Sequence, residues 1–134
     1  MKEHEIALFN DSLERCTARH DFLDRFYEKF LASSKEVADK FCKTDFKTQK
    51  KLLKASLYMM MSAAMGKSEA ETHLQHIAKV HGRKQHDIRP ELYDLWLDCL
   101  VGTARDFDPG FNADTERAWR NMMAPGIAFM KSRY

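Results

Sequence analysis

The chain has 134 residues, of which 44% are hydrophobic, and its 22 lysines and arginines are nearly balanced by 20 aspartates and glutamates. A chain of this length predicts one domain with a core that can also enclose a cofactor, and its mean hydropathy of −0.56 argues against a membrane protein. The formal net charge of +2 is too small to predict a nucleic-acid or anionic-membrane partner.

Cysteine spacing and the first residues indicate the compartment. Cys16, Cys42 and Cys99 are far apart and have no C-x-x-C spacing, so we expect reduced thiols in the core. The segment MKEHEIALFNDSLE carries acidic residues where a signal peptide would carry an apolar run. No stretch of about 18 apolar residues occurs anywhere. We therefore expect a cytoplasmic protein.

All periodic segments of the chain have the helical period, and none alternates between apolar and polar residues, so the sequence predicts an all-α fold of six to eight helices. The first helix is expected at about residues 3–18, where apolar residues recur three and four positions apart. The second, at about residues 22–32, follows Asp21 as its N-cap and is rich in aromatic residues, among them Tyr27.

A short third helix and a long fourth helix follow. The third is expected to begin at a capping box formed by Ser33 and Glu36 and to end at Phe41. The fourth is expected at about residues 45–65. Its inner line is predicted to hold Gln49, Leu53, Ser56 and Met60.

A histidine lies on the inner face of the fifth predicted helix. Gly66 is expected to end the fourth helix, and Ser68 with Glu71 to form a capping box for the fifth. His81 lies four residues after Ile77, so it shares the apolar face of this helix. An inward imidazole needs a hydrogen-bond partner or a metal, because an unpaired buried polar group costs about 1–3 kcal/mol. Taken alone, His81 is most simply a core histidine.

Two further helices complete the chain. The sixth is expected to start at Pro90 and to be broken by Asp108-Pro109-Gly110. The last begins near Asn112 and should be kinked near Asn121, because Pro125 removes one backbone hydrogen bond. No repeat, low-complexity stretch or linker interrupts the pattern, so residues 1–134 are predicted to form a single domain.

Four residues at particular separations, Tyr27, Phe41, Gln49 and His81, resemble the residues that enclose haem in the globin family. The likeness is to single-domain bacterial globins and to the haem domain of flavohaemoglobins. Gln49 and His81 are 32 residues apart, as are the distal glutamine and proximal histidine of those proteins. The run from Ile88 to Tyr93 resembles their I-x-P-E-x-Y motif. Taken alone, Tyr27 and Phe41 could be ordinary core aromatic residues and Gln49 an exposed helix residue, but the combination favours a haem site.

The resemblance implies roles for these residues. It implies haem b, iron protoporphyrin IX, ligated through His81, and Tyr27 and Gln49 as hydrogen-bond donors to the bound gas. We expect the second ring nitrogen of His81 to donate to the carbonyl oxygen of Ile77, one helical turn back. The side chains implied to line the haem pocket are Phe41, Gln49, Leu52, Leu53, Ile77, Ile88, Tyr93 and Trp96.

Two departures from flavohaemoglobins bear on activity. The segment from His81 to Ile88 is about two residues longer than in those proteins. The second departure is that we expect no reductase domain and see no glutamate in the last helix that matches theirs. A carboxylate behind the histidine would favour cleavage of the O–O bond, so its absence argues for reversible binding.

The expected function is reversible binding of dioxygen, and of NO and CO, at ferrous iron by an oxygen carrier or store that is not an enzyme. An NO dioxygenase or a gas sensor working with a separate reductase or partner is an alternative. A haem-free helical scaffold on the globin fold is a second alternative. Oligomeric state is not determined by the sequence.

Overall fold

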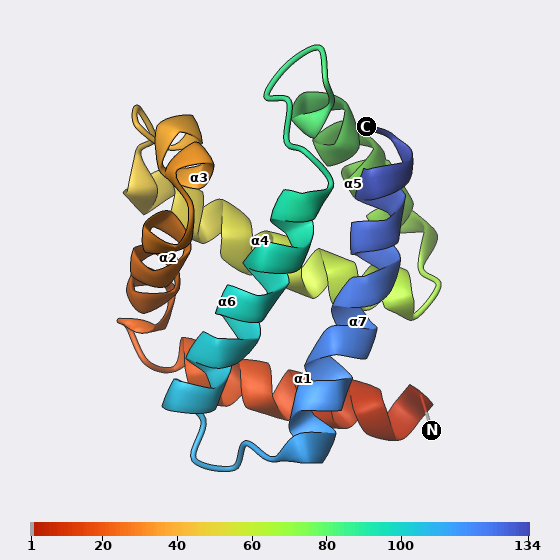
Figure 1. Cartoon of the computed structure of the whole chain (residues 1–134). Helices are drawn as coiled ribbons and strands as arrows, with labels where there is room; N and C mark the ends of the chain where they lie inside the picture. The colour runs from red at the N-terminus through yellow and green to blue at the C-terminus, as the bar shows by residue number, and fades with distance from the viewer. Residues whose placement is uncertain (1) are drawn as a thin grey trace. The chain divides into compact units, whose positions relative to one another are not determined.

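The computed structural model describes residues 2–134, with side chains from Glu3 onward. Seven α-helices and no β-strand occur in this range, which confirms the predicted all-α fold (Figure 1). The helices are α1 (Lys2–Thr17), α2 (Phe22–Ser33), α3 (Lys35–Lys40), α4 (Phe46–Ala64), α5 (Ser68–His81), α6 (Glu91–Phe107) and α7 (Ala113–Ser132).

The junction between α2 and α3 differs from the prediction by one residue. Ser34, not Ser33, caps α3, and its hydroxyl accepts a hydrogen bond from the Val37 amide at 3.4 Å. Helix α2 extends to Ser33, whose hydroxyl instead donates to the carbonyl oxygen of Phe30 at 2.6 Å. Two adjacent serines both suit a cap, and the extra residue of α2 decides between them. Phe41 is the C-cap of α3, as predicted.

Other helix ends follow the sequence signals in part. Asp45 caps α4, with its carboxylate accepting from the backbone amide two residues on at 3.1 Å. Gly66 takes a left-handed conformation with φ of 80° after α4, which suits a residue without Cβ. The capping box predicted at Ser68 is wrong, because Ser68 is already helical and Lys67 is the N-cap. Asp21 is the N-cap of α2 but makes no side-chain capping bond.

The chain forms two compact units, and the first comprises the residues up to Lys43 together with Leu95–Met122. It contains α1, α2, α3 and most of α6. Its core is aromatic: the rings of Phe9 and Trp119 meet edge to face with centroids 4.8 Å apart, and both side chains are fully buried. Whether the whole chain acts as a single domain stays a prediction.

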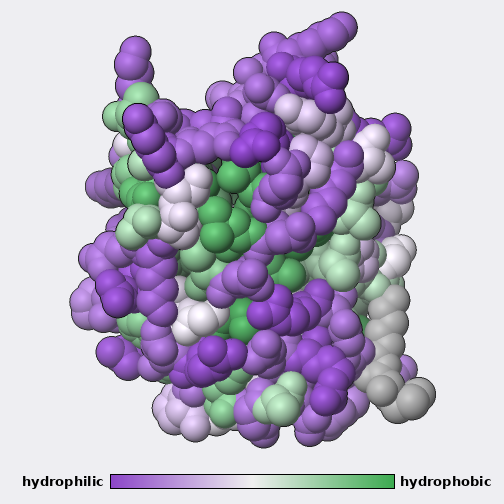
Figure 2. All heavy atoms as spheres, in the orientation of Figure 1, coloured by the Kyte–Doolittle hydropathy of each residue, from purple (hydrophilic) through white to green (hydrophobic). Residues whose placement is uncertain are grey.

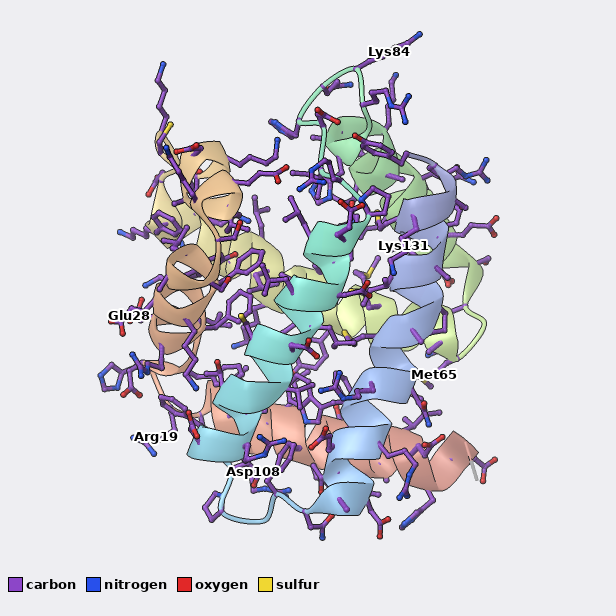
Figure 3. The ribbon with its side chains drawn as sticks, viewed as in Figure 1. Arg19, Glu28, Met65, Lys84, Asp108 and Lys131 are labelled. Atoms are coloured by element: carbon purple, nitrogen blue, oxygen red, sulfur yellow. The ribbon has the colours of Figure 1, made fainter. Side chains whose placement is uncertain are left out.

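A buried carboxylate joins three helices of the first unit where the sequence predicted only a helix break. Asp108, at the end of α6 (Figure 3), accepts hydrogen bonds from the Ser12 hydroxyl at 2.6 Å, from Arg15 at 3.0 Å and from the Gly110 amide at 2.8 Å. Ser12 in turn accepts from the Trp119 indole at 2.9 Å. Burial alone would raise the pKa of Asp108, but these hydrogen bonds, Arg15 first, hold it below its ordinary value.

The second unit comprises Thr44–Asp94 and Met123–Tyr134. Helices α4 and α5 pack against each other in it and bury Leu53, Leu57, Met60, Leu74 and Ala78. The approach of α7 to Met60 is close at Gly126, since an added Cβ would lie 2.7 Å from the terminal carbon of the Met60 side chain, which would then have to shift. Pro125 lies inside α7, and the kink expected near Asn121 stays a prediction.

Hydrophilic residues cover most of the face that Figure 2 shows, with some hydrophobic residues visible among them. No helix of residues 2–134 is long and apolar enough to span a membrane. The exposed large hydrophobic residues are Leu52 and Met65, at 56% and 38% exposure. The cysteines are free thiols, as predicted, but only Cys16 is fully buried, while Cys99 is partly buried and Cys42 is exposed.

Candidate functional site

His81 is the last residue of α5 and pairs with a tyrosine from the start of α6. Its Nδ1 lies 3.1 Å from the Tyr93 hydroxyl oxygen, and the two ring centroids are 6.2 Å apart. The sequence-based expectation that the Ile77 carbonyl oxygen is the partner is therefore wrong. Because α5 ends at His81, the ring meets the chain that returns through the following loop instead of bonding to its own helix.

The environment of His81 keeps its imidazole neutral. Burial, and then the charge of His86, lowers the pKa of His81 to about 4, so the ring is uncharged at neutral pH. Burial also raises the pKa of Tyr93 to about 12, which keeps its phenol neutral. A neutral imidazole has one donor and one acceptor nitrogen. With Nδ1 held by Tyr93, Nε2 is the nitrogen left to ligate a metal.

The loop between α5 and α6 folds back onto the end of α5. The Ile88 amide donates to the His81 carbonyl oxygen at 2.9 Å, and the Asp87 amide donates to that of Gly82 at 2.9 Å. Asp87 takes a left-handed conformation with φ of 51°, which a short polar side chain tolerates. The loop extends outward to Lys84 (Figure 3). The longer segment noted in the sequence is thus anchored at both ends by its backbone.

A residue that sequence reasoning missed ties down the same loop. The Tyr134 hydroxyl donates to the carboxylate of Asp87, and the Arg83 guanidinium lies over the Tyr134 ring at 4.7 Å from its centroid. All three residues belong to the second unit. No spacing in the sequence signals this contact, since Asp87 and Tyr134 are joined only by the fold.

The other residues singled out in the second unit differ in burial. Leu53 is buried at 6% exposure, whereas Gln49, Ile77 and Ile88 are partly buried. Leu52, on the outer side of α4, is exposed. The structure therefore brings His81 and Tyr93 into contact, and the place of the other five residues in a haem pocket stays a prediction.

In the first unit, three predicted site residues belong to one aromatic cluster. Tyr27 is buried, and its ring centroid lies 5.7 Å from that of Phe41 and 5.0 Å from that of Phe26. Phe26 also meets Trp96 edge to face at 6.3 Å, and Phe41 lies 6.1 Å from Phe30. These residues come from α2, from the end of α3 and from α6. Tyr27 is therefore held within a packed aromatic environment.

No group of three or more histidine, cysteine, aspartate or glutamate side chains that could hold a metal occurs among the described residues. In the second unit, His81 offers a neutral imidazole with Nε2 left to ligate a metal, and the first unit offers the buried phenol of Tyr27 among aromatic rings. Such a single nitrogen ligand suits a metal whose other ligands come from a cofactor.

Comparison with known proteins identifies the family. The family model for globins matches residues 24–129, a segment that contains every predicted site residue. The chain is similar to a Pseudomonas aeruginosa protein whose crystal structure is described as structurally highly homologous to a human haemoglobin. The two sequences are 42% identical, and the structures superpose with a TM-score of 0.92 over 97% of this chain and 98% of that chain. No curated protein matches the chain. The chain belongs to the globin family.

Proposed function

We propose that this globin binds haem b through Nε2 of His81 and reversibly binds a diatomic gas, dioxygen above all, as a carrier or store. The observation that carries the proposal is the neutral imidazole of His81, whose Nδ1 is occupied by the Tyr93 hydroxyl at 3.1 Å. Ligation of iron through Nε2 requires the tautomer with the proton on Nδ1, and the Tyr93 hydroxyl oxygen is placed to accept a hydrogen bond from that proton.

The residues present fit a haem. A neutral imidazole is the proximal ligand that globins use, and its second nitrogen has a hydrogen-bond partner, as metal-bound histidines require. Leu53 supplies an apolar side chain on α4, and Phe41 and Trp96 supply aromatic ones. When bound, haem supplies a ferrous iron with a coordination position open to a small gas.

We propose Tyr27 and Gln49 as the donors that stabilise the gas ligand. A phenol hydroxyl and a side-chain amide can each donate to an oxygen that carries partial negative charge. A hydrogen bond to a charged acceptor contributes about 1.5–3 kcal/mol, which corresponds to roughly 10-fold to 150-fold in affinity. Packing of Tyr27 against Phe26 and Phe41 limits the rotation of its ring and so reduces the entropy that the bond costs.

The partner of His81 favours reversible binding over oxidation chemistry. Tyr93 stays a neutral phenol because its pKa is raised to about 12, so it draws the Nδ1 proton less strongly than a carboxylate would. The imidazole of His81 would then donate less electron density to the iron, which disfavours cleavage of an O–O bond. Two alternatives are to be tested. One is an NO dioxygenase or gas sensor that works with a separate partner, and the other is a haem-free scaffold.

The test is the absorption spectrum of the purified protein, reduced with dithionite and exposed to carbon monoxide. We expect a Soret band that shifts with carbon monoxide, is lost in His81→Gly and returns with added imidazole. His86→Gly is the matched control, because its ring lies 6.4 Å from that of His81 and is not a proposed ligand. No haem after reconstitution would favour the scaffold. Repeated consumption of NO with a supplied electron donor would favour the dioxygenase.

A further inference from the structure

Four lysines lie along one face of α4, within the second unit. Lys47, Lys50, Lys51 and Lys54 recur at offsets of three and four residues, so they leave the same side of the helix. Lys50 is partly exposed and the other three are exposed to solvent. We call these four residues the α4 lysine stripe.

The stripe has no acidic counterpart on its own helix, because α4 contains four lysines and no aspartate or glutamate. Within residues 2–134, no ion pair is described for its three exposed lysines. All the other helices contain acidic residues, and some of these pair with a cation of the same helix, as where Arg25 pairs with Glu28 at 2.8 Å and Arg117 with Asp114 at 2.8 Å. The clustering on α4 is thus unlike the charge pattern of the other helices.

The position of the stripe works against the stability of its helix. Lys47 lies in the first turn of α4, where the helix dipole is positive and disfavours a cation. Lys47 and Lys51, like Lys50 and Lys54, are four residues apart, a spacing at which like charges repel. An anionic partner would offset both effects. This favours binding over folding as the use of the stripe.

An acidic protein surface fits the stripe better than a lipid membrane does. Helices that lie in membranes combine lysines with a broad apolar face. Leu52, the large hydrophobic residue exposed on α4, is rotated by about 100° from Lys51 around the helix, so it lies outside the stripe. The net charge of the whole chain is only +2, so a helix with four lysines and no acidic residue departs from the nearly balanced charge of the chain.

We propose that the α4 lysine stripe docks the acidic surface of an electron-donor protein. The inference rests on the proposed haem function, because iron that has been oxidised to the ferric state must regain one electron before it binds dioxygen again. The donor loses that electron and the iron gains it, with no bond formed or broken and no proton required. Gln49 and Leu53, both proposed for the haem pocket, lie on the helix that carries the stripe.

The test follows reduction of the ferric haem protein by reduced flavodoxin, a small acidic flavoprotein, under carbon monoxide by stopped-flow absorption. Wild type is compared with Lys47→Glu/Lys51→Glu and with Lys35→Glu/Lys67→Glu, which changes the net charge equally at exposed lysines outside the stripe. At an ionic strength of about 20 mM we expect the stripe variant to react at least about tenfold more slowly and the control less than about threefold. The three rates should converge at about 0.5 M salt. Equal slowing of both variants, or none in the stripe variant, would overturn the proposal.

Two further measurements separate failure of docking from failure of the haem proposal. Reduction by dithionite under carbon monoxide needs no docking, so a missing Soret shift in wild type would refute the haem function and with it the electron transfer. Calorimetric titration of flavodoxin into the haem-free protein tests the stripe directly, and we expect only the stripe variant to lose at least about tenfold in affinity. No binding by wild type, or a preference for phosphatidylserine vesicles over flavodoxin, would refute docking of an acidic protein.

Discussion

Replacing Tyr93 by phenylalanine isolates the hydrogen bond that holds the second ring nitrogen of His81. The aromatic ring stays, and only the hydroxyl 3.1 Å from Nδ1 is removed. His81 is partly buried, and this burial lowers its pKa to about 4, so water has limited access to replace the lost partner of the freed nitrogen. The substitution therefore leaves a partly buried donor without its partner.

The size of the effect follows from two independent estimates. An unpaired buried donor costs about 1–3 kcal/mol. Loss of the partner behind a metal-bound histidine lowers metal affinity by about 10-fold to 100-fold, which corresponds to about 1.4–2.8 kcal/mol. Because the two ranges agree, we expect Tyr93→Phe to release haem roughly 10-fold to 100-fold faster than wild type.

Haem release is measured by absorption after the ferric protein is mixed with an excess of haem-free myoglobin, which captures the released haem. Tyr58→Phe is the matched control, because Tyr58 is a partly buried tyrosine of the same unit for which no role at the haem is proposed. If Tyr93→Phe released haem within about twofold of the control, the positioning role of Tyr93 would be refuted. The result would mean that Nδ1 finds another acceptor, such as the Ile77 carbonyl oxygen expected from the sequence.

Three further predictions test other parts of the molecule. Tyr27→Phe should accelerate oxygen dissociation by roughly 10-fold to 150-fold in flash photolysis, while carbon monoxide release stays nearly unchanged. An oxygen dissociation rate within about twofold of wild type would exclude Tyr27 as the hydrogen-bond donor. Asp108→Asn should lower the free energy of unfolding by about 1–2 kcal/mol in urea at pH 7. The pKa of Asp108 is held below its ordinary value of 3.8, so the ionised carboxylate stabilises the fold above that pH, and this stabilisation is lost as the pH falls further. If the difference in unfolding free energy between wild type and Asp108→Asn persisted undiminished at about pH 2, the stabilising role of the carboxylate would be contradicted. Gly102→Ala, with no atom within 4 Å of the new Cβ, should stabilise by about 0.5–1 kcal/mol. Gly126→Ala should stabilise less or destabilise, because the Met60 side chain must shift to admit the new Cβ. Equal melting temperatures for the two variants would contradict the packing argument.

Features that depend on local periodicity were predictable from the sequence. The apolar spacing that predicted α5 depends on residues within one helix, and α5 contains both Ile77 and His81 as that spacing predicts. Gly66 marks the end of α4 because its left-handed conformation is a local requirement of the backbone. The choice between Ser33 and Ser34 was not predictable, because both satisfy the same local rule and one extra turn residue decides the outcome.

Contacts between distant residues were not predictable, even where each residue was noted. His81 and Tyr93 were both assigned to the haem pocket, but their hydrogen bond depends on how the loop between them folds back. The local sequence marks Asp108 only as part of a helix break, although its partner Ser12 lies 96 positions earlier. A carboxylate next to proline and glycine has an ordinary role in a turn, so nothing in its local sequence signals burial.

The separation of His81 from a carboxylate bears directly on the proposed chemistry. Asp87 is the carboxylate closest to His81 along the chain, and a carboxylate bonded to Nδ1 would make the imidazole a stronger electron donor. Its oxygen instead accepts from the Tyr134 hydroxyl, while the neutral phenol of Tyr93 takes Nδ1. The fold of this loop thus leaves His81 with a weakly polarising partner. A ligand of that kind suits release of an unchanged gas molecule better than cleavage of its bond.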